Sequence, residues 1–342
     1  MIRLRFRGKL LVVLLGALVI IQGSIIAHTA LRVRTNSIAK TTKLLTASAE
    51  REAEELSKTM TRFVVTAQTL AASLEECNRT APEARKDVID MTRQILAQTP
   101  GALSAWFVFE PNAFDGKDSE FSGVDGFKET GRFEGTFVRN NGSIIRTYDT
   151  TEESLQDGDW YYGPLRSGHP MIEEPCRYSY VDNGESYLIT TLSIPIKLDG
   201  KNIGVVGLDV DLAAFTEKVT AISVTEHSYN TLFSNEGYML YHPNKNLVEK
   251  NLEEVGRGKI KNLDEILNII TTGDKKTCIE YSINLNEDIL RVQTPIPLGS
   301  NLAPWSLSIT VPLSDVTAAP NRLIRNLILT SLLGLVLLGL VI

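Results

Sequence analysis

Cysteine and histidine are scarce in this sequence of 342 residues, with three of the former and four of the latter. No two of them form a CxxC, an HExxH or another spacing that metal sites and thiol redox centres use. We therefore expect neither a metal nor a cofactor. The cysteines, Cys77, Cys176 and Cys278, are far apart, so one disulfide or three free thiols are both compatible with the sequence.

Signatures of common enzyme classes are also missing. The chain contains no GxSxG nucleophile motif and no phosphate-binding Walker loop. The formal net charge is −6, which disfavours nucleic acid as a partner. We expect a protein that is not an enzyme, although carboxylates are plentiful and an enzyme anchored on the outer face of a membrane stays open as an alternative.

A long uncharged run lies near each end of the chain. The first, Leu10 to Ala27, is 18 residues long and follows four basic residues within positions 1–9. As a helix it spans about 27 Å, close to the thickness of the hydrocarbon core of a bilayer. It exceeds a signal-peptide core and no small-x-small cleavage site follows it. We therefore predict an uncleaved membrane helix at 10–30, with residues 1–9 in the cytoplasm.

The second run, Leu327 to Ile342, follows Arg322 and Arg325 and has 16 residues, which span only about 24 Å. We expect a second membrane helix at 323–342, cut short by the end of the given sequence, with the rest of a longer protein continuing in the cytoplasm. The segment between the two helices then lies in the periplasm of a cell with an inner membrane. Setting aside the six basic residues that flank the runs changes the formal charge from −6 to −12, so this segment is acidic.

Proline and glycine are absent from residues 35–76, where apolar side chains recur every three or four positions. The stripe consists of Leu45, Ala49, Ala53, Leu56, Met60, Phe63, Ala67, Leu70 and Leu74. This pattern predicts a spine helix along the whole extracytoplasmic region, and its length of about 60 Å exceeds what one small domain covers. We expect a second copy of the chain to bury the excess, which would make the protein a homodimer.

The remaining residues show strand and turn patterns. Residues 82–98 predict a second helix with Thr80 as its N-cap, and Asn140-Asn141-Gly142-Ser143 and Asp199-Gly200 predict hairpin turns. The expected strands are 102–110, 133–139, 144–148, 187–196, 203–210, 229–233, 238–242, 277–282, 289–295 and 305–311, with short helices at 215–222 and 263–271. The pattern predicts an α+β fold with antiparallel sheets in two successive modules, a distal one at 80–212 and a proximal one at 213–315.

Three stretches resemble the double Cache family, which pairs two PAS-like modules as an extracytoplasmic sensor. The first combines Asp159-Trp160-Tyr161-Tyr162, Tyr180-Val181-Asp182 and Ile194-Pro195-Ile196. The second is the run GVVGLDVDL at 204–212. The third combines Asn235-Glu236-Gly237-Tyr238, His242-Pro243-Asn244 and residues 304–312. In this order, between two membrane helices, they extend over residues 35–315, and the resemblance implies that the distal module binds a small polar metabolite.

The resemblance also implies which residues bind the ligand. In the amino-acid-binding branch of the family, a Trp-Tyr pair, a Tyr-x-Asp and a later Asp line the distal pocket. The matching positions here are Trp160, Tyr161, Tyr180, Asp182 and Asp209. The family's Arg, which clamps the ligand carboxylate two residues before the Trp, is missing, and Gly158 lies there between Asp157 and Asp159.

The retained residues suit an ammonium group, because carboxylates accept charge-assisted hydrogen bonds and aromatic faces attract cations. A ligand carboxylate would lack its bidentate partner. We therefore predict the sensor region of a methyl-accepting chemotaxis protein that detects an amine-bearing metabolite and signals to cytoplasmic partners. A histidine kinase or a cyclic-dinucleotide enzyme could use the same sensor, and these outputs stay open.

Overall fold

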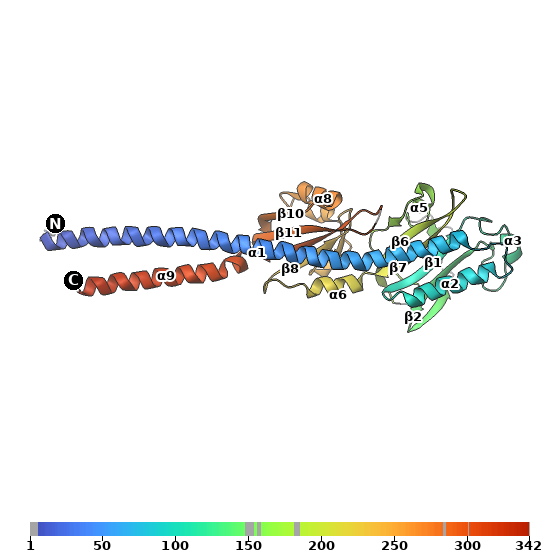
Figure 1. Ribbon diagram of the computed structural model, residues 1–342, viewed down its shortest axis with the longest axis horizontal. Helices are drawn as coiled ribbons and strands as arrows, with labels where there is room; N and C mark the ends of the chain where they lie inside the picture. The colour runs from blue at the N-terminus through green and yellow to red at the C-terminus, as the bar shows by residue number, and fades with distance from the viewer. Residues whose placement is uncertain are drawn as a thin grey trace.

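One helix, α1 (Phe6–Glu76), organises the molecule. The computed structural model describes residues 6–147, 154–155, 159–180, 185–282, 285–299 and 301–341. Two modules lie one after the other along α1. The N- and C-termini lie together at the end of the molecule that is away from both modules (Figure 1). The expected fold class is confirmed: an α+β chain with a long N-terminal helix and two antiparallel sheets.

The distal module contains a seven-stranded sheet in the order β3-β2-β1-β7-β6-β4, and β5 also pairs with β6. The strands are β1 (Ala102–Phe109), β2 (Glu134–Asn140), β3 (Ser143–Thr147), β4 (Met171–Ile172), β5 (Cys176–Tyr178), β6 (Tyr187–Leu198) and β7 (Lys201–Asp211). Helices α1 and α2 (Ala84–Gln98) cover the face that carries Phe107 and Leu208. Helix α5 (Tyr162–Ser167) lies on the other face, beside Trp106 and Val205. The two faces differ because successive residues of a strand point to opposite sides.

Two tight hairpins shape this sheet, and both were predicted from their turn residues. Asn141 and Gly142 connect β2 to β3 with φ values of 46° and 80°. Asp199 and Gly200 connect β6 to β7 with φ values of 50° and 78°. Two consecutive positive φ values are typical of the turn whose twist matches that of the flanking strands, and Asn, Asp and Gly adopt them most readily.

The proximal module contains a five-stranded sheet in the order β10-β11-β12-β8-β9. The strands are β8 (Tyr229–Phe233), β9 (Met239–Tyr241), β10 (Lys276–Ser282), β11 (Glu287–Ile296) and β12 (Trp305–Pro312). The helices are α6 (Ala213–Ala221), η1 (Lys245–Leu247), α7 (Leu252–Gly256) and α8 (Leu263–Thr272). Phe233, Leu252 and Ile266 form a core with α7 and α8 on one side of the sheet, whereas Leu307 and Ile309 join the core along α1.

The apolar stripe of α1 lies inside a single chain. Each of its nine residues is at most 2% exposed, because α1 packs along β6 and β7 of the distal sheet and β11 and β12 of the proximal sheet. The helix also continues without a break from the uncharged N-terminal run into the spine, so that its 71 residues extend over about 107 Å. The stripe therefore needs no second chain to cover it, and the reason given above for a homodimer was wrong.

The start of the second helix also differs from the prediction. Helix α2 begins at Ala84 after Glu83, and its N-cap makes no side-chain hydrogen bond. Thr80 lies outside the helix, where its hydroxyl donates to Oδ1 of Asn78 at 2.8 Å. The side chain of Asn78 forms a local turn that ends α1, so Thr80 belongs to this turn and the predicted cap was wrong.

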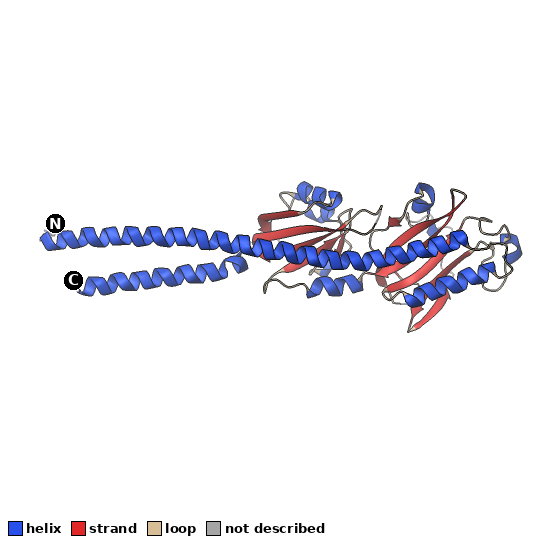
Figure 2. Ribbon diagram, in the orientation of Figure 1, coloured by secondary structure: helices blue, strands red, loops and turns tan. Residues whose placement is uncertain are grey.

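Two helices are long and apolar enough to cross a membrane: α1 from Val12 onward and α9 (Leu313–Val341). No part of either apolar window is buried within the molecule, so these side chains face outward. The two helices leave the proximal module side by side (Figure 2). A hydrogen bond of 2.9 Å from the Ser37 hydroxyl to the carbonyl of Val316 fixes their relative height.

Candidate functional site

The candidate site lies on the face of the distal sheet that is turned away from α1. Strand pairing places Ser104 of β1 and Thr191 of β6 directly opposite Asp209 of β7, one on each side. Trp106 is two residues along β1 from Ser104 and therefore projects from the same face. The pairing thus brings together residues that are about a hundred positions apart in the sequence.

The carboxylate of Asp209 is the centre of this group. The residue is 6% exposed and accepts hydrogen bonds from Trp106 Nε1 at 3.3 Å, Tyr180 Oη at 2.8 Å and Thr191 Oγ1 at 2.9 Å, and from the hydroxyl of Ser104. Burial raises the pKa of Asp209, and these hydrogen bonds oppose the rise. All four donors are neutral, so the site holds a carboxylate in a fixed orientation without a cation among the described residues.

Gly207, two residues before Asp209 on the same face of β7, makes room for the indole of Trp106. A Cβ atom at Gly207 would lie 2.2 Å from Cζ2 of Trp106 and 2.6 Å from the carbonyl oxygen of Leu192. The run GVVGLDV is therefore explained by packing: Val206 and Leu208 belong to the core along α1, whereas Gly207 faces the site.

The predicted aromatic residues occupy different places. Tyr180 is 6% exposed and contacts Asp209 directly through its hydroxyl. Trp160 is half-buried, and its ring meets that of Trp106 edge to face at 4.9 Å between centroids. Its indole N–H donates to the carbonyl of Ser154 at 3.0 Å. Trp160 thus contacts Trp106, which in turn bonds to Asp209.

Tyr161 is fully buried and belongs to a separate polar network. Its hydroxyl bonds to Glu110 and accepts a hydrogen bond of 2.6 Å from Nη2 of Arg132. Burial, followed by the hydrogen bond to Glu110, raises the pKa of Tyr161 well above its ordinary value. Arg132 also donates to the carbonyl of Phe109 at 2.7 Å and contacts Glu110 at 3.2 Å, so its charge is already matched.

Asp182, the fifth predicted residue, lies outside the described residues. The same holds for Gly158, which occupies the position of the missing Arg, and for its neighbour Asp157. Asp159 is described and is exposed.

A further carboxylate near the site was not predicted. Glu173 lies between β4 and β5, where its backbone N–H donates to the carbonyl of Thr191 at 2.9 Å. Its carboxyl group lies beside the backbone N–H groups of Asp159 and Trp160. Burial first, and then the charges of Asp159 and Asp209, raise the pKa of Glu173 to about 7. No sequence motif marks this residue, because its place depends on how the short strands fold back onto β6.

Comparison with known proteins agrees with this architecture. The Cache domain family dCache_1 matches residues 27–320. The methyl-accepting chemotaxis protein TlpQ of Pseudomonas aeruginosa is 28% identical over 270 residues, which are 72% of this chain and 35% of TlpQ. An extracellular domain attributed to a histidine kinase, mmHK1S-Z2, superposes with a TM-score of 0.70 at 22% identity and covers 81% of this chain and 98% of its own. The ligand-binding domain of the Pseudomonas aeruginosa chemoreceptor PctC, in complex with GABA, superposes with a TM-score of 0.55 at 17% identity, covering 79% and 99%.

The family match extends over most of the sequence, and two PAS-like sheets lie along one long helix as the resemblance implied. The chain belongs to the Cache domain family. It spans about a third of the length of TlpQ.

Proposed function

We propose that this chain is the ligand-binding sensor region of a transmembrane chemoreceptor and that its distal module binds a small amine-bearing metabolite. The buried carboxylate of Asp209 carries the proposal, because its described partners are all neutral and the carboxyl group of Glu173 lies nearby. A ligand ammonium group would supply the missing positive charge through charge-assisted hydrogen bonds. We propose Asp182 as the second carboxylate, with Tyr180, Trp160 and Tyr161 enclosing the ligand.

Amino acids are a second candidate ligand class. PctC was solved with GABA, which carries both an amine and a carboxylate, and Arg132 could attract a carboxylate. Arg132 is, however, already bonded to Glu110, Tyr161 and the carbonyl of Phe109. A ligand carboxylate would have to displace these bonds, so the amine remains the favoured class.

The test is a thermal-shift screen of residues 35–318 against amines, amino acids, organic acids and purines, with calorimetry on the hits. We expect the largest shifts from amines. A dicarboxylate as the best ligand would contradict the charge argument, and hydrolysis of a screened compound would favour the alternative of a membrane-anchored enzyme.

The output module is also a proposal. We favour a methyl-accepting chemotaxis protein in the inner membrane, with the two modules in the periplasm, because TlpQ carries that name. The likeness to mmHK1S-Z2 keeps a histidine kinase as the alternative, with a cyclic-dinucleotide enzyme as a further one. Joining residues 1–342 to a known chemoreceptor output should give ligand-dependent signalling if the coupling passes through α9.

A homodimer remains our proposal, although the apolar stripe of α1 cannot form it. The outward face of α1 carries Leu44 and Val65, which are 60% and 53% exposed, among charged residues such as Arg51 and Lys58. Because this face is polar, we expect two copies of α1 to bind each other only weakly through it. The dimer would then also need contacts between the membrane helices. Single cysteines at Leu44 and Val65 should crosslink in the membrane, whereas cysteines at the buried Leu45 and Leu56 should not. Equal crosslinking at all four positions would contradict this arrangement.

The connection between β4 and β5 contacts both modules. Glu173 faces the site, whereas the buried carboxyl group of Glu174 lies beside Ser234 and Glu236 in the β8–β9 turn of the proximal module. Arg177 of β5 adds an ion pair with Glu249 at 2.8 Å. We propose that this connection transmits ligand binding to the proximal module.

Glu174→Gln should change how stability depends on pH. Burial, and the like charge of Glu236, raise the pKa of Glu174 to about 7, compared with about 4.3 in an unfolded chain. The folded wild type keeps a proton that the unfolded chain releases, so it loses stability as the pH rises between these two values. Gln does not titrate, so the variant should gain about 1–2 kcal/mol relative to wild type between about pH 5 and about pH 8, allowing for partial solvent access.

Urea unfolding at the two pH values measures this difference. The exposed Glu120 provides the matched control, and Glu120→Gln should leave the difference unchanged. Parallel pH profiles for wild type and Glu174→Gln would contradict the proposal that this carboxyl group is held between the modules.

A further inference from the structure

Positive charge is concentrated where the two membrane helices leave the proximal module. Residues 1–49 contain no Asp or Glu, and neither do residues 316–342. Just beyond the uncharged run of α1 come His28, Arg32 and Arg34, and α9 carries Arg322 and Arg325. The base of an otherwise acidic molecule is therefore cationic. We call the group His28, Arg32, Arg322 and Arg325 the basic collar.

The residues of the basic collar lie at the same height on two neighbouring helices. The hydrogen bond between Ser37 and Val316 marks one shared level, and from there α1 and α9 run in opposite sequence directions toward the termini. Each helix rises about 1.5 Å per residue, so Arg322 is level with Leu31 and Arg325 with His28. The collar thus occupies an axial layer of about 6 Å.

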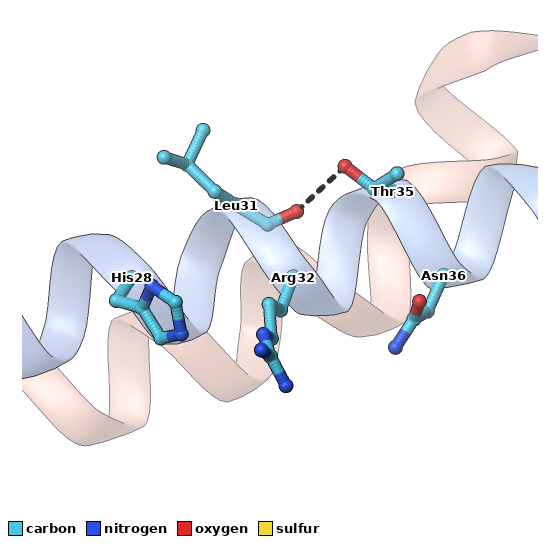
Figure 3. Close-up of a pocket in the computed structure, with 5 residues that line it drawn as sticks. All are labelled: His28, Leu31, Arg32, Thr35 and Asn36. Atoms are coloured by element: carbon cyan, nitrogen blue, oxygen red, sulfur yellow. Dashed lines mark hydrogen bonds between the residues drawn. The ribbon is translucent and has the colours of Figure 1, made fainter.

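An open hollow on the exposed face of α1 overlaps this layer and extends beyond it to Asn36. It has a volume of about 310 Å³ and is lined by His28, Leu31, Arg32, Thr35 and Asn36. His28, Arg32 and Asn36 project from one side of α1 on successive turns, and α9 passes behind them (Figure 3). A water molecule occupies about 30 Å³ in the liquid, so the space is large enough for a phosphate group with some of its water.

The cations of the collar have no acidic partner within the described part of the chain. The nearest acidic residue on α9, Asp315, is held by His227 at 3.0 Å, and the nearest on α1, Glu50, is held by Lys275 at 2.8 Å. These two carboxylates are therefore already paired.

The depth of the collar indicates what kind of anion reaches it. The uncharged run of α1 spans about the hydrocarbon core, so His28 and Arg32 lie at the level of the lipid head groups. Below them, the exposed Leu327 and Ile328 of α9 face the acyl region. A phospholipid would match both chemistries at once, whereas a soluble anion would use only the cations.

We propose that the basic collar binds the phosphate of an anionic phospholipid in the outer leaflet of the membrane. This inference rests on the proposed topology, with the modules outside the cytoplasm. Cations on that side run against the usual bias of membrane proteins toward cytoplasmic basic residues, and a bound lipid phosphate offsets their charge.

The test uses the full 342-residue chain in nanodiscs that contain phosphatidylglycerol and phosphatidylethanolamine. Native mass spectrometry of the released protein reports which lipid it retains. Wild type should retain phosphatidylglycerol preferentially, and the triple variant Arg32→Gln, Arg322→Gln, Arg325→Gln should weaken that retention by at least about tenfold, or about 1.4 kcal/mol. The control Arg51→Gln, Lys58→Gln, Arg62→Gln removes the same charge from the exposed face of α1 beside the modules and should retain the lipid as wild type does.

Three results would overturn the proposal. The first is equal retention of the two lipids by wild type, the second is unchanged retention by the collar variant, and the third is displacement of the lipid by inorganic phosphate alone. A separate experiment in cells, with a reporter fused at residue 150, tests the topology. A cytoplasmic reporter signal would refute the topology itself, whereas an external signal with unchanged lipid retention would refute only the collar.

Discussion

Asp209→Asn should weaken ligand binding by at least about tenfold, which corresponds to about 1.4 kcal/mol. The ammonium group of the proposed ligand would lose a buried charged partner, and removing one member of such a pair usually costs more than this threshold. The amide keeps nearly the same shape beside Ser104, Trp106 and Thr191, so the effect should fall on binding and not on folding. Calorimetry with the best hit from the ligand screen measures the affinity.

Two controls accompany this measurement. The melting temperature of the unliganded Asp209→Asn variant should stay close to that of wild type, which shows that the module is folded. Tyr238→Ala alters the proximal module and should leave affinity nearly unchanged. An affinity that survives Asp209→Asn intact would show that the ligand does not use this carboxylate.

Arg85→Met should lower the free energy of unfolding by about 3–5 kcal/mol. Arg85 is 5% exposed and bonds to both oxygens of Asp115, at 2.7 and 2.9 Å, and to Asp118 at 2.7 Å. It also donates to the carbonyl of Gly131 at 3.1 Å, and its guanidinium lies 4.1 Å from the ring centre of Phe121. Without Arg85, two buried carboxylates would lack their counter-charge.

Urea unfolding of residues 35–318 measures this decrease in the free energy of unfolding. Arg93→Met is the matched control, because Arg93 lies on the same helix but is exposed, and its loss should cost less than about 1 kcal/mol. Adding Asp115→Asn and Asp118→Asn to Arg85→Met should restore part of the stability, since the stranded charges disappear. A triple variant no more stable than Arg85→Met would show that Arg85 acts through packing.

Local patterns in the sequence predicted most of the strands and both distal hairpins. Asn141-Gly142 and Asp199-Gly200 fix their turns through their own backbone preferences, so neighbouring residues suffice to find them. The strands β4 and β5 have only two and three residues, too few for a period to emerge. The apolar stripe of α1 was recognised, but a periodic stripe does not indicate whether the same chain or another one covers it.

The site was predictable only in part, for a related reason. Resemblance pointed to Tyr180 and Asp209, which the structure brings into contact. Ser104 and Trp106 complete the environment of Asp209 from a strand about a hundred residues away, and the sheet order decides that pairing. Glu173 and Arg132 lie in connecting segments, where no local pattern distinguishes a buried charge from a solvated one.

The unbroken course of α1 also gives the molecule a mechanical property. The helix runs without a break over about 107 Å, along the distal sheet and the proximal sheet and on through the N-terminal apolar segment. For a straight rod of this length, a tilt of about one degree moves the far end by about 2 Å. Helix α1 therefore has the geometry of a lever: a distortion at the distal sheet too slight to change any strand pairing would still displace the N-terminal end of the helix by more than the length of a covalent bond.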